Sequence, residues 1–323
     1  MTTRDKITED LREIIENADL PYYENPFNDL PYPVIGEIKD HEQIKKTSIK
    51  EILKGLDNPQ DKNFIDVLFD DDFTEEIDEI IRRSEEEGRA LSDIEEVFED
   101  NGTRREQTIQ RGPPCAWYQP IHFYPNNWGI YIRKSCIKKE MVKLARITNL
   151  SKVRGPNKKI QLYLAAFLEF YFHEQFHHKV ESFGFRLLAS DLTRHRHGSI
   201  YKHYMIRIYQ QYFGTSDCLE ESLANAESIL RMSKDGYEKK LDKNIRNSSK
   251  KLQIYFMKNY AIPGYKEGLN YLTENRFKNG LRYFQSQVVE CNLKPSFTNK
   301  FWGYAPYMTR SMMNIDTEIY LIV

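Results

Sequence analysis

Apolar side chains recur every three or four positions along most of this 323-residue chain. Such spacing places them on one face of a helix and therefore predicts amphipathic helices. We predict helices over the segments 4–17, 42–55, 74–98, 137–148, 159–183, 201–213, 219–232, 251–261 and 265–290. The polar stretch over 184–200 is predicted to be an irregular connection.

Aromatic and β-branched residues take over from this helical pattern in two neighbouring stretches. Residues 115–124 and 128–132 are rich in such side chains and are separated by Pro125, Asn126 and Asn127. This arrangement predicts two strands joined by a turn. The C-terminal stretch, 315–323, is also strand-like. The predicted fold class is α+β. The chain is expected to be mainly helical, with a domain that contains a small sheet and a helical region N-terminal to that domain.

The segment over 159–183 is apolar on nearly every face, which is typical of a helix buried inside a domain. Within it, Glu169, His173 and His177 follow one another at four-residue steps and so share one stripe. Ionisable side chains in such an environment are costly unless they are paired or bind a metal. A single metal ion would satisfy both histidines.

The stripe contains the pattern His-Glu-x-x-His, formed by His173, Glu174 and His177. Two imidazoles one turn apart can present nitrogens to one ion. Glu174, next to the first histidine, is then placed to deprotonate an attacking water. His178 lies about 100° around the helix from this stripe and is not expected to be a ligand.

Together with Glu221 and Asn225 on a later helix, this pattern resembles the gluzincin branch of the zincin metallopeptidases. The resemblance covers about 60 residues. It implies a hydrolase that cuts protein or peptide substrates, with a zincin-like catalytic domain. It implies one zinc ion per chain held by His173, His177 and Glu221. It also implies that Glu174 is the general base and that Asn225 orients His173 from outside the coordination shell.

The third ligand has a neighbour that competes with it, because Glu220 stands directly before Glu221. Glu221 is preferred, since it leaves Asn225 four residues later, where the family pattern has its Asp or Asn. The metzincin branch does not fit, because Val180 and Phe183 stand where that branch has its glycine and its third histidine.

Three further residues are candidates for supporting roles. Glu169 is expected to orient a ligand or to be structural, although a ligating role stays open. His203 or Tyr204 is a candidate for stabilising the oxyanion of the tetrahedral intermediate. Tyr201 and Tyr209 of the same helix are alternatives, and a packed aromatic face is the simpler interpretation of each.

Charge divides the chain in two. Residues 1–105 hold 30 acidic and 14 basic side chains, whereas residues 106–323 hold 18 and 33. We therefore predict an acidic, mostly helical N-terminal region over 1–105 and a catalytic domain over 106–323. Opposite charges favour docking of the first on the second. Such docking would suit a regulated intracellular protease of toxin or defence type.

Part of the basic excess suggests a different class of function. Lys152, Arg154, Lys158 and Lys159 cluster in one loop, with aromatic residues nearby. The alternative is a nucleic-acid-binding or interaction protein with a structural or vestigial zinc site. The sequence contains no recognised nucleic-acid motif in support of it.

The cysteine spacing and the hydropathy of the chain predict the cellular compartment of the protein. Four scattered cysteines with no Cys-x-x-Cys spacing predict reduced thiols and no cysteine zinc site. No apolar run is long enough to span a bilayer, and polar residues stand where a signal peptide has its apolar core. We therefore predict a cytoplasmic protein without a membrane partner.

Overall fold

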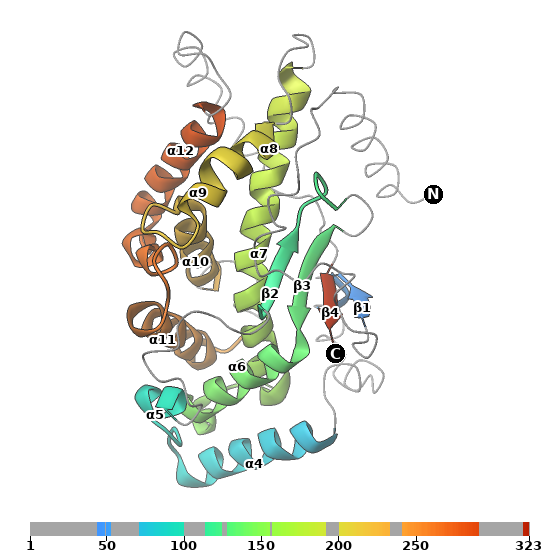
Figure 1. The fold of residues 1–323 in the computed structure, drawn as a ribbon. Helices are drawn as coiled ribbons and strands as arrows, with labels where there is room; N and C mark the ends of the chain where they lie inside the picture. The colour runs from blue at the N-terminus through green and yellow to red at the C-terminus, as the bar shows by residue number, and fades with distance from the viewer. Residues whose placement is uncertain are drawn as a thin grey trace.

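The structure, a computed structural model, describes residues 44–48, 50–52, 71–99, 114–124, 128–155, 157–191, 200–232, 241–290 and 319–322. Helices make up most of it, and a small mixed sheet lies along one side (Figure 1). The predicted α+β class, mainly helical with a small sheet, is confirmed. The predicted helix over 4–17 lies outside the described residues.

The sheet has four strands in the order β1-β4-β3-β2. The predicted hairpin is confirmed as β2 (Ala116–Gln119) and β3 (Gly129–Arg133), which pair antiparallel. The predicted C-terminal strand is confirmed as β4 (Ile319–Ile322), which runs parallel to β3. Among the described strands, β2 therefore forms one edge of the sheet.

The strand at the other edge, β1 (Ile44–Thr47), corrects the first part of the predicted helix over 42–55, within which residues 50–52 are helical. It pairs antiparallel with β4, so that Ile44 lies opposite Ile322. A short apolar run does not distinguish a strand from a helix by its spacing alone. The partner strand at the far end of the sequence decides the outcome here.

The predicted helix over 74–98 is also wrong as a single element. It consists of α4 (Asp71–Glu87) and α5 (Ile94–Glu99), with a turn between them. Gly88, which directly follows α4, has a φ of 66°. Glycine adopts this left-handed conformation without steric cost and commonly ends helices.

The remaining predicted helices exist, but several have different bounds. Helix α7 continues to Asp191, so the predicted irregular stretch is wrong over its first part. The helix predicted over 251–261 begins at Lys243, and the segment over 265–290 contains two helices. The elements are α6 (Lys134–Ile147), η2 (Leu150–Lys152), α7 (Lys158–Asp191), α8 (Ile200–Tyr204), the π turn η3 (Met205–Tyr209), α9 (Gln210–Tyr212), α10 (Leu219–Met232), α11 (Lys243–Asn259), η5 (Lys266–Tyr271) and α12 (Glu274–Glu290).

Helix α7 is the centre of the molecule, as its apolar composition predicts. It packs against α10, α6 and the strands β2 and β3 (Figure 1). Its Gly184 permits a close approach of α8, because a Cβ atom there would lie 2.8 Å from the Cβ of Tyr201. Although α7 has 34 residues, no helix in the described ranges has the length and apolar character needed to cross a bilayer.

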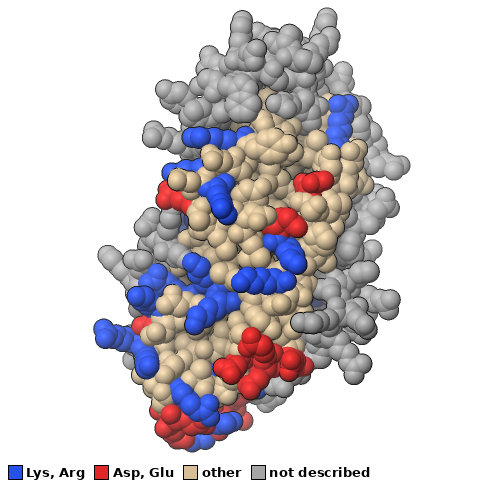
Figure 2. All heavy atoms as spheres, turned by 90° about the vertical axis from the view of Figure 1, so that its left-hand side faces the viewer, with Lys and Arg blue, Asp and Glu red and all other residues tan. Residues whose placement is uncertain are grey.

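The acidic helix α4 contacts the basic start of α7. Nζ of Lys159 lies 2.7 Å from Oδ2 of Asp78, and Nζ of Lys158 lies 2.5 Å from Oε1 of Glu85. Figure 2 shows acidic side chains gathered at the lower end of one face, where Figure 1 places α4 and α5. These are the contacts expected if the acidic region docks on the basic one, although the domain boundary itself stays a prediction.

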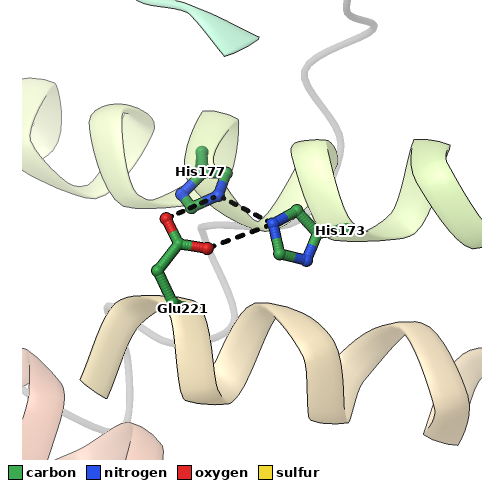
Figure 3. A group of neighbouring side chains, drawn as sticks. All are labelled: His173, His177 and Glu221. Atoms are coloured by element: carbon green, nitrogen blue, oxygen red, sulfur yellow. Dashed lines mark hydrogen bonds and ion pairs between the residues drawn. The ribbon is translucent and has the colours of Figure 1, made fainter. Parts of the chain in front are cut away.

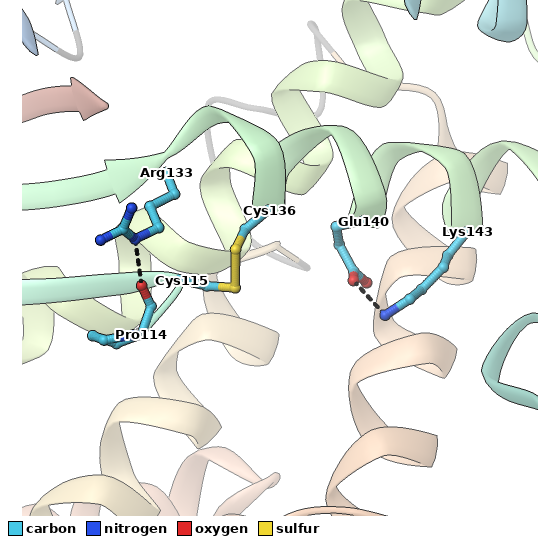
Figure 4. Close-up of a disulfide and its surroundings, with 6 residues drawn as sticks. All are labelled: Pro114, Cys115, Arg133, Cys136, Glu140 and Lys143. Atoms are coloured by element: carbon cyan, nitrogen blue, oxygen red, sulfur yellow. Dashed lines mark hydrogen bonds and ion pairs between the residues drawn. A yellow bond between two sulfur atoms is a disulfide. The ribbon is translucent and has the colours of Figure 1, made fainter. Parts of the chain in front are cut away.

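Two cysteines correct the prediction of reduced thiols. Cys115 and Cys136 form a disulfide (Figure 4). Cys218 is free and buried. The pairing of β2 with β3 explains the proximity, since Arg133 donates its backbone N–H to the carbonyl of Cys115 at 2.9 Å. Helix α6 begins at the next residue and brings Cys136 back to the start of β2. This pairing depends on tertiary structure and leaves no sign in the cysteine spacing.

Candidate metal centre

The side chains of His173, His177 and Glu221 converge between α7 and α10 (Figure 3). Nε2 of His173 lies 3.3 Å from Nε2 of His177 and 3.2 Å from Oε2 of Glu221. Nε2 of His177 lies 3.6 Å from Oε1 of Glu221. The two imidazoles come from successive turns of α7, and the carboxylate comes from the first turn of α10.

These separations fit a metal ion. A tetrahedral zinc ion with bonds of about 2.0–2.1 Å holds its ligand atoms about 3.3–3.4 Å apart. Oε2 of Glu221 is buried and accepts no hydrogen bond from the described residues. Nε2 of His173 lies beside this oxygen, and a cation between the two atoms would bind both of them. The group can therefore hold a metal ion, and two imidazoles with one carboxylate suit zinc.

The other ring nitrogens of the two histidines are held by side chains of α10. Nδ1 of His173 lies 3.0 Å from Oδ1 of Asn225, which is the contact expected from the sequence. Nδ1 of His177 lies 2.7 Å from Oε1 of Glu220. Such contacts fix the tautomer and direct Nε2 toward the metal position. Glu220 thus faces the far side of His177, and Glu221 is the carboxylate of the metal group.

A second layer of support comes from Tyr204, the last residue of α8, and Tyr209, the last residue of the π turn η3. Tyr204 donates its hydroxyl to Oε2 of Glu220 at 2.6 Å, and Tyr209 donates to Oε1 of Glu221 at 2.5 Å. In an α-helix, residues five apart diverge around the axis, but i→i+5 hydrogen bonding brings them one turn apart. The π turn therefore places both tyrosines on the face that meets α10. In the sequence, only the five-residue spacing of the two tyrosines pointed to a shared face. An α-helix would place residues at that spacing on different faces, so the spacing was not recognised.

Glu174 is buried at the wall of the site, with 6% of its surface exposed. Burial raises the pKa of its carboxyl group. The positive charges of His173 and His177 oppose this rise, Glu221 adds to it, and a hydrogen bond from the backbone of Tyr118 lowers the pKa slightly. A carboxylate with a raised pKa is a stronger base, which suits proton transfer near neutral pH.

The histidines and carboxylates of the metal group strongly shift one another's pKa values. Burial lowers the pKa of His177, but the carboxylates of Glu221, Glu220 and Glu174 more than offset this and raise it to about 10. Burial raises the pKa of Glu221, but His177 and His173 more than offset this and lower it to about 2. The metal-free site therefore keeps a proton on His177. A divalent cation would displace that proton, since imidazole binds metals in its neutral form.

A cavity of about 780 Å³ adjoins this group. His173, Glu174 and His177 contribute to its lining. The strand β2 borders it, since Ala116, Trp117 and Tyr118 belong to its lining. Apolar side chains from α5, α7, α9–α10 and α11 form much of the remaining wall: Phe98, Phe170, Phe213, Phe256 and Met257.

His178 takes part in a separate buried network that sequence reasoning missed. Its Nδ1 lies 2.8 Å from the hydroxyl of Tyr118, which also donates to Glu181. Glu181 accepts the backbone N–H of His122 at 2.9 Å, and its carboxylate lies 2.6 Å from Nδ1 of the same residue. This network fixes the end of β2 to α7 and thus positions the strand beside Glu174. Glu181 lies seven residues after Glu174 and therefore on the same face of α7. This spacing was the feature of the sequence that could have indicated a role for Glu181 near the site.

Three expected supporting residues have other surroundings. The cavity lining includes neither His203 nor Tyr204, and the hydroxyl of Tyr204 is occupied by Glu220. An oxyanion role for these two residues is therefore not supported. Glu169 does line the cavity, but the charged groups that act on it are Glu140 and Lys143 and not the metal group. It is therefore not placed to orient a ligand.

Comparison of the chain with protein-family models, with curated proteins and with solved structures finds no match. The site therefore rests on its own geometry.

We predict that Glu220→Gln weakens zinc binding by about 10–100-fold, because the neutral amide holds His177 less firmly. Glu221→Gln should have a larger effect, since it removes a charged ligand. A competition titration against a coloured chelator measures both. Glu227→Gln is the matched control, because it removes a carboxylate from the same helix that pairs with Lys179 instead. A larger loss in Glu220→Gln than in Glu221→Gln would reverse the assignment of the third ligand.

Proposed function

We propose that this protein is a zinc-dependent peptidase with a zincin-like catalytic site of the gluzincin type and one zinc ion per chain. The observation that carries the proposal is the convergence of four groups. His173, His177 and Glu221 form the metal group, and Glu174 stands beside them at the wall of the same cavity. This is the arrangement that a metal-assisted hydrolysis needs.

A bound zinc ion supplies Lewis-acid chemistry at this point: it lowers the pKa of water and polarises a carbonyl. Glu174 accepts the proton of the attacking water and can return it to the leaving amine. Its raised pKa supports both steps, because the group must exchange a proton near neutral pH. Asn225 and Glu220 keep the two imidazoles in position, and Tyr209 does the same for Glu221.

The position of β2 supports an extended peptide as the substrate. This strand is at the edge of the sheet among the described strands, and it borders the cavity. A peptide can add to such an edge through backbone hydrogen bonds and then lie across the metal group. The network of Tyr118, His178 and Glu181 holds this edge at a fixed distance from α7.

Two observations bear on the alternative of a nucleic-acid-binding protein with a structural zinc. Structural zinc sites have four protein ligands and are closed, whereas the metal group here has three members, two of which, His173 and His177, line a large cavity. Lys158 and Lys159, two of the four basic residues behind that alternative, lie at the start of α7 and pair with Glu85 and Asp78 of α4. No observation specifically favours that alternative.

Removal of the metal tests the proposal. A strong chelator should abolish cleavage of an unfolded, fluorescently quenched protein substrate. Addition of zinc should restore the rate in proportion to occupancy, with full activity at about one ion per chain. Sustained cleavage by thoroughly metal-free protein would contradict the proposal.

A further inference from the structure

A second charged group lies in the same cavity, away from the metal group. Glu169 is one helical turn before His173 on α7, which is a rise of about 6 Å along the axis. Glu140 and Lys143 of α6 line the cavity with it. Glu140 is 9% exposed, and the carboxyl group of Glu169 is buried among these neighbours.

The positive charge in this group is already engaged. Nζ of Lys143 lies 3.2 Å from Oε2 of Glu140 (Figure 4) and 4.8 Å from the centre of the Phe98 ring. Two carboxyl groups thus share one ammonium group. The effect on Glu169 is visible in its pKa, which burial and then the charge of Glu140 raise, against the opposing charge of Lys143.

One oxygen of Glu169 has no donor. Oε2 is buried and accepts no hydrogen bond from the described residues. The hydroxyl of Ser228 on α10 donates to the backbone carbonyl of Glu169 at 2.9 Å. This hydroxyl therefore binds the main chain of Glu169 and not its carboxylate. Glu169 lines the cavity, so a cationic ligand there can donate to its carboxyl group, which has no donor at Oε2 among the described residues.

The walls around this position suit a long side chain with a cationic end. The rings of Phe98 and Tyr260 stack at 4.9 Å, and both residues line the cavity. Aromatic faces bind ammonium and guanidinium groups and also cover the aliphatic stems that carry them. The contact of Lys143 with Phe98 shows that a lysine side chain fits against this wall.

We infer that Glu169 and Glu140 form a specificity subsite for a cationic side chain, lysine or arginine, of the peptide substrate. This inference rests on the proposed peptidase function, because it assigns a preference to that same cavity. An extended chain advances about 3.3 Å per residue, so the subsite is about two residues from the bond that is cut. The preferred basic residue therefore lies within about two residues of that bond.

The first test maps cleavage sites in a pool of random peptides by mass spectrometry. In the wild-type protein, lysine and arginine should be enriched at one position within about two residues of the cut. Glu169→Gln should remove this enrichment and lower kcat/KM about tenfold or more for a lysine-containing peptide. For the twin peptide with norleucine in place of lysine, the change should stay within about twofold. Unchanged enrichment in Glu169→Gln would overturn the inference.

Glu274→Gln is the control for net charge, since the side chain of Glu274 is 56% exposed on α12 and pairs with the solvent-exposed Lys278. It should leave the lysine preference intact. Thermal unfolding of Glu169→Gln checks that the variant is folded. If Glu169→Gln does not fold, Glu140→Gln serves the same purpose, and it should reduce the preference in the same direction.

A binding measurement separates this inference from the proposed function. In the Glu174→Gln background, the lysine peptide should bind at least about tenfold more tightly than the norleucine peptide, and adding Glu169→Gln should remove the difference. Equal binding of the two peptides would overturn the subsite even if cleavage occurs. A retained lysine preference in a protein that cleaves no peptide would refute the peptidase and leave the subsite standing.

Discussion

Glu174→Gln should lower the rate of peptide hydrolysis by about 10²–10⁴-fold, which is the usual contribution of a positioned general base. Glutamine keeps the size and the buried position of the side chain but cannot accept a proton. Because Glu174 is not one of the three residues of the metal group, the variant should bind zinc as the wild-type protein does. Initial rates with a quenched peptide and zinc content by elemental analysis measure the two effects.

The separation of the two effects gives this prediction its value. A variant that loses both activity and zinc has been disrupted structurally and says nothing about the base. Glu274→Gln, on the exposed face of α12, controls for the loss of one negative charge and should keep full activity. Full activity in Glu174→Gln with zinc bound would refute the mechanism.

Replacing both His173 and His177 with alanine should abolish zinc binding and, with it, the stabilisation that zinc provides. A ligand that binds only the folded state stabilises it by about 4 kcal/mol at a concentration 1,000 times its dissociation constant. Zinc at that level should therefore raise the melting temperature of the wild-type protein and leave that of the double variant unchanged. Differential scanning calorimetry of chelator-treated protein, with and without added zinc, measures this.

His203→Ala is the matched control for this pair. His203 lies on α8, and the metal group of the described residues does not include it. The control should bind zinc and gain the same stabilisation as the wild-type protein. If zinc stabilises the double variant as strongly as the wild-type protein, the ion binds elsewhere in the chain.

The two histidines of the metal group could be placed together from the sequence because local periodicity determines their spacing, whereas Glu221 followed from the family resemblance. His173 and His177 lie one turn apart on a helix whose apolar composition marks it as buried, and Asn225 lies one turn after Glu221. Both pairs are four residues apart, so the two residues of each pair share a helix face independently of the tertiary structure. The contact of Glu220 with Nδ1 of His177 was not accessible in this way, since it depends on how α10 packs against α7.

Features that depend on distant parts of the chain could not be predicted. The strand β1 exists because β4 pairs with it, and the sequence around Ile44 is equally compatible with a helix. The disulfide between Cys115 and Cys136 arises from the return of α6 to the start of β2. Glu169 shares the stripe of the histidines, yet its neighbours come from α6, so its surroundings follow from packing and not from spacing.

The central claim is that one metal ion is held by His173, His177 and Glu221, and anomalous scattering tests it most directly. Crystals grown with zinc should give one strong anomalous difference peak at the zinc edge. It should lie about 2.0–2.2 Å from Nε2 of both histidines and from a carboxylate oxygen of Glu221, with a further position open to the cavity. A crystal of the zinc-loaded protein with no peak between these three side chains would contradict the account.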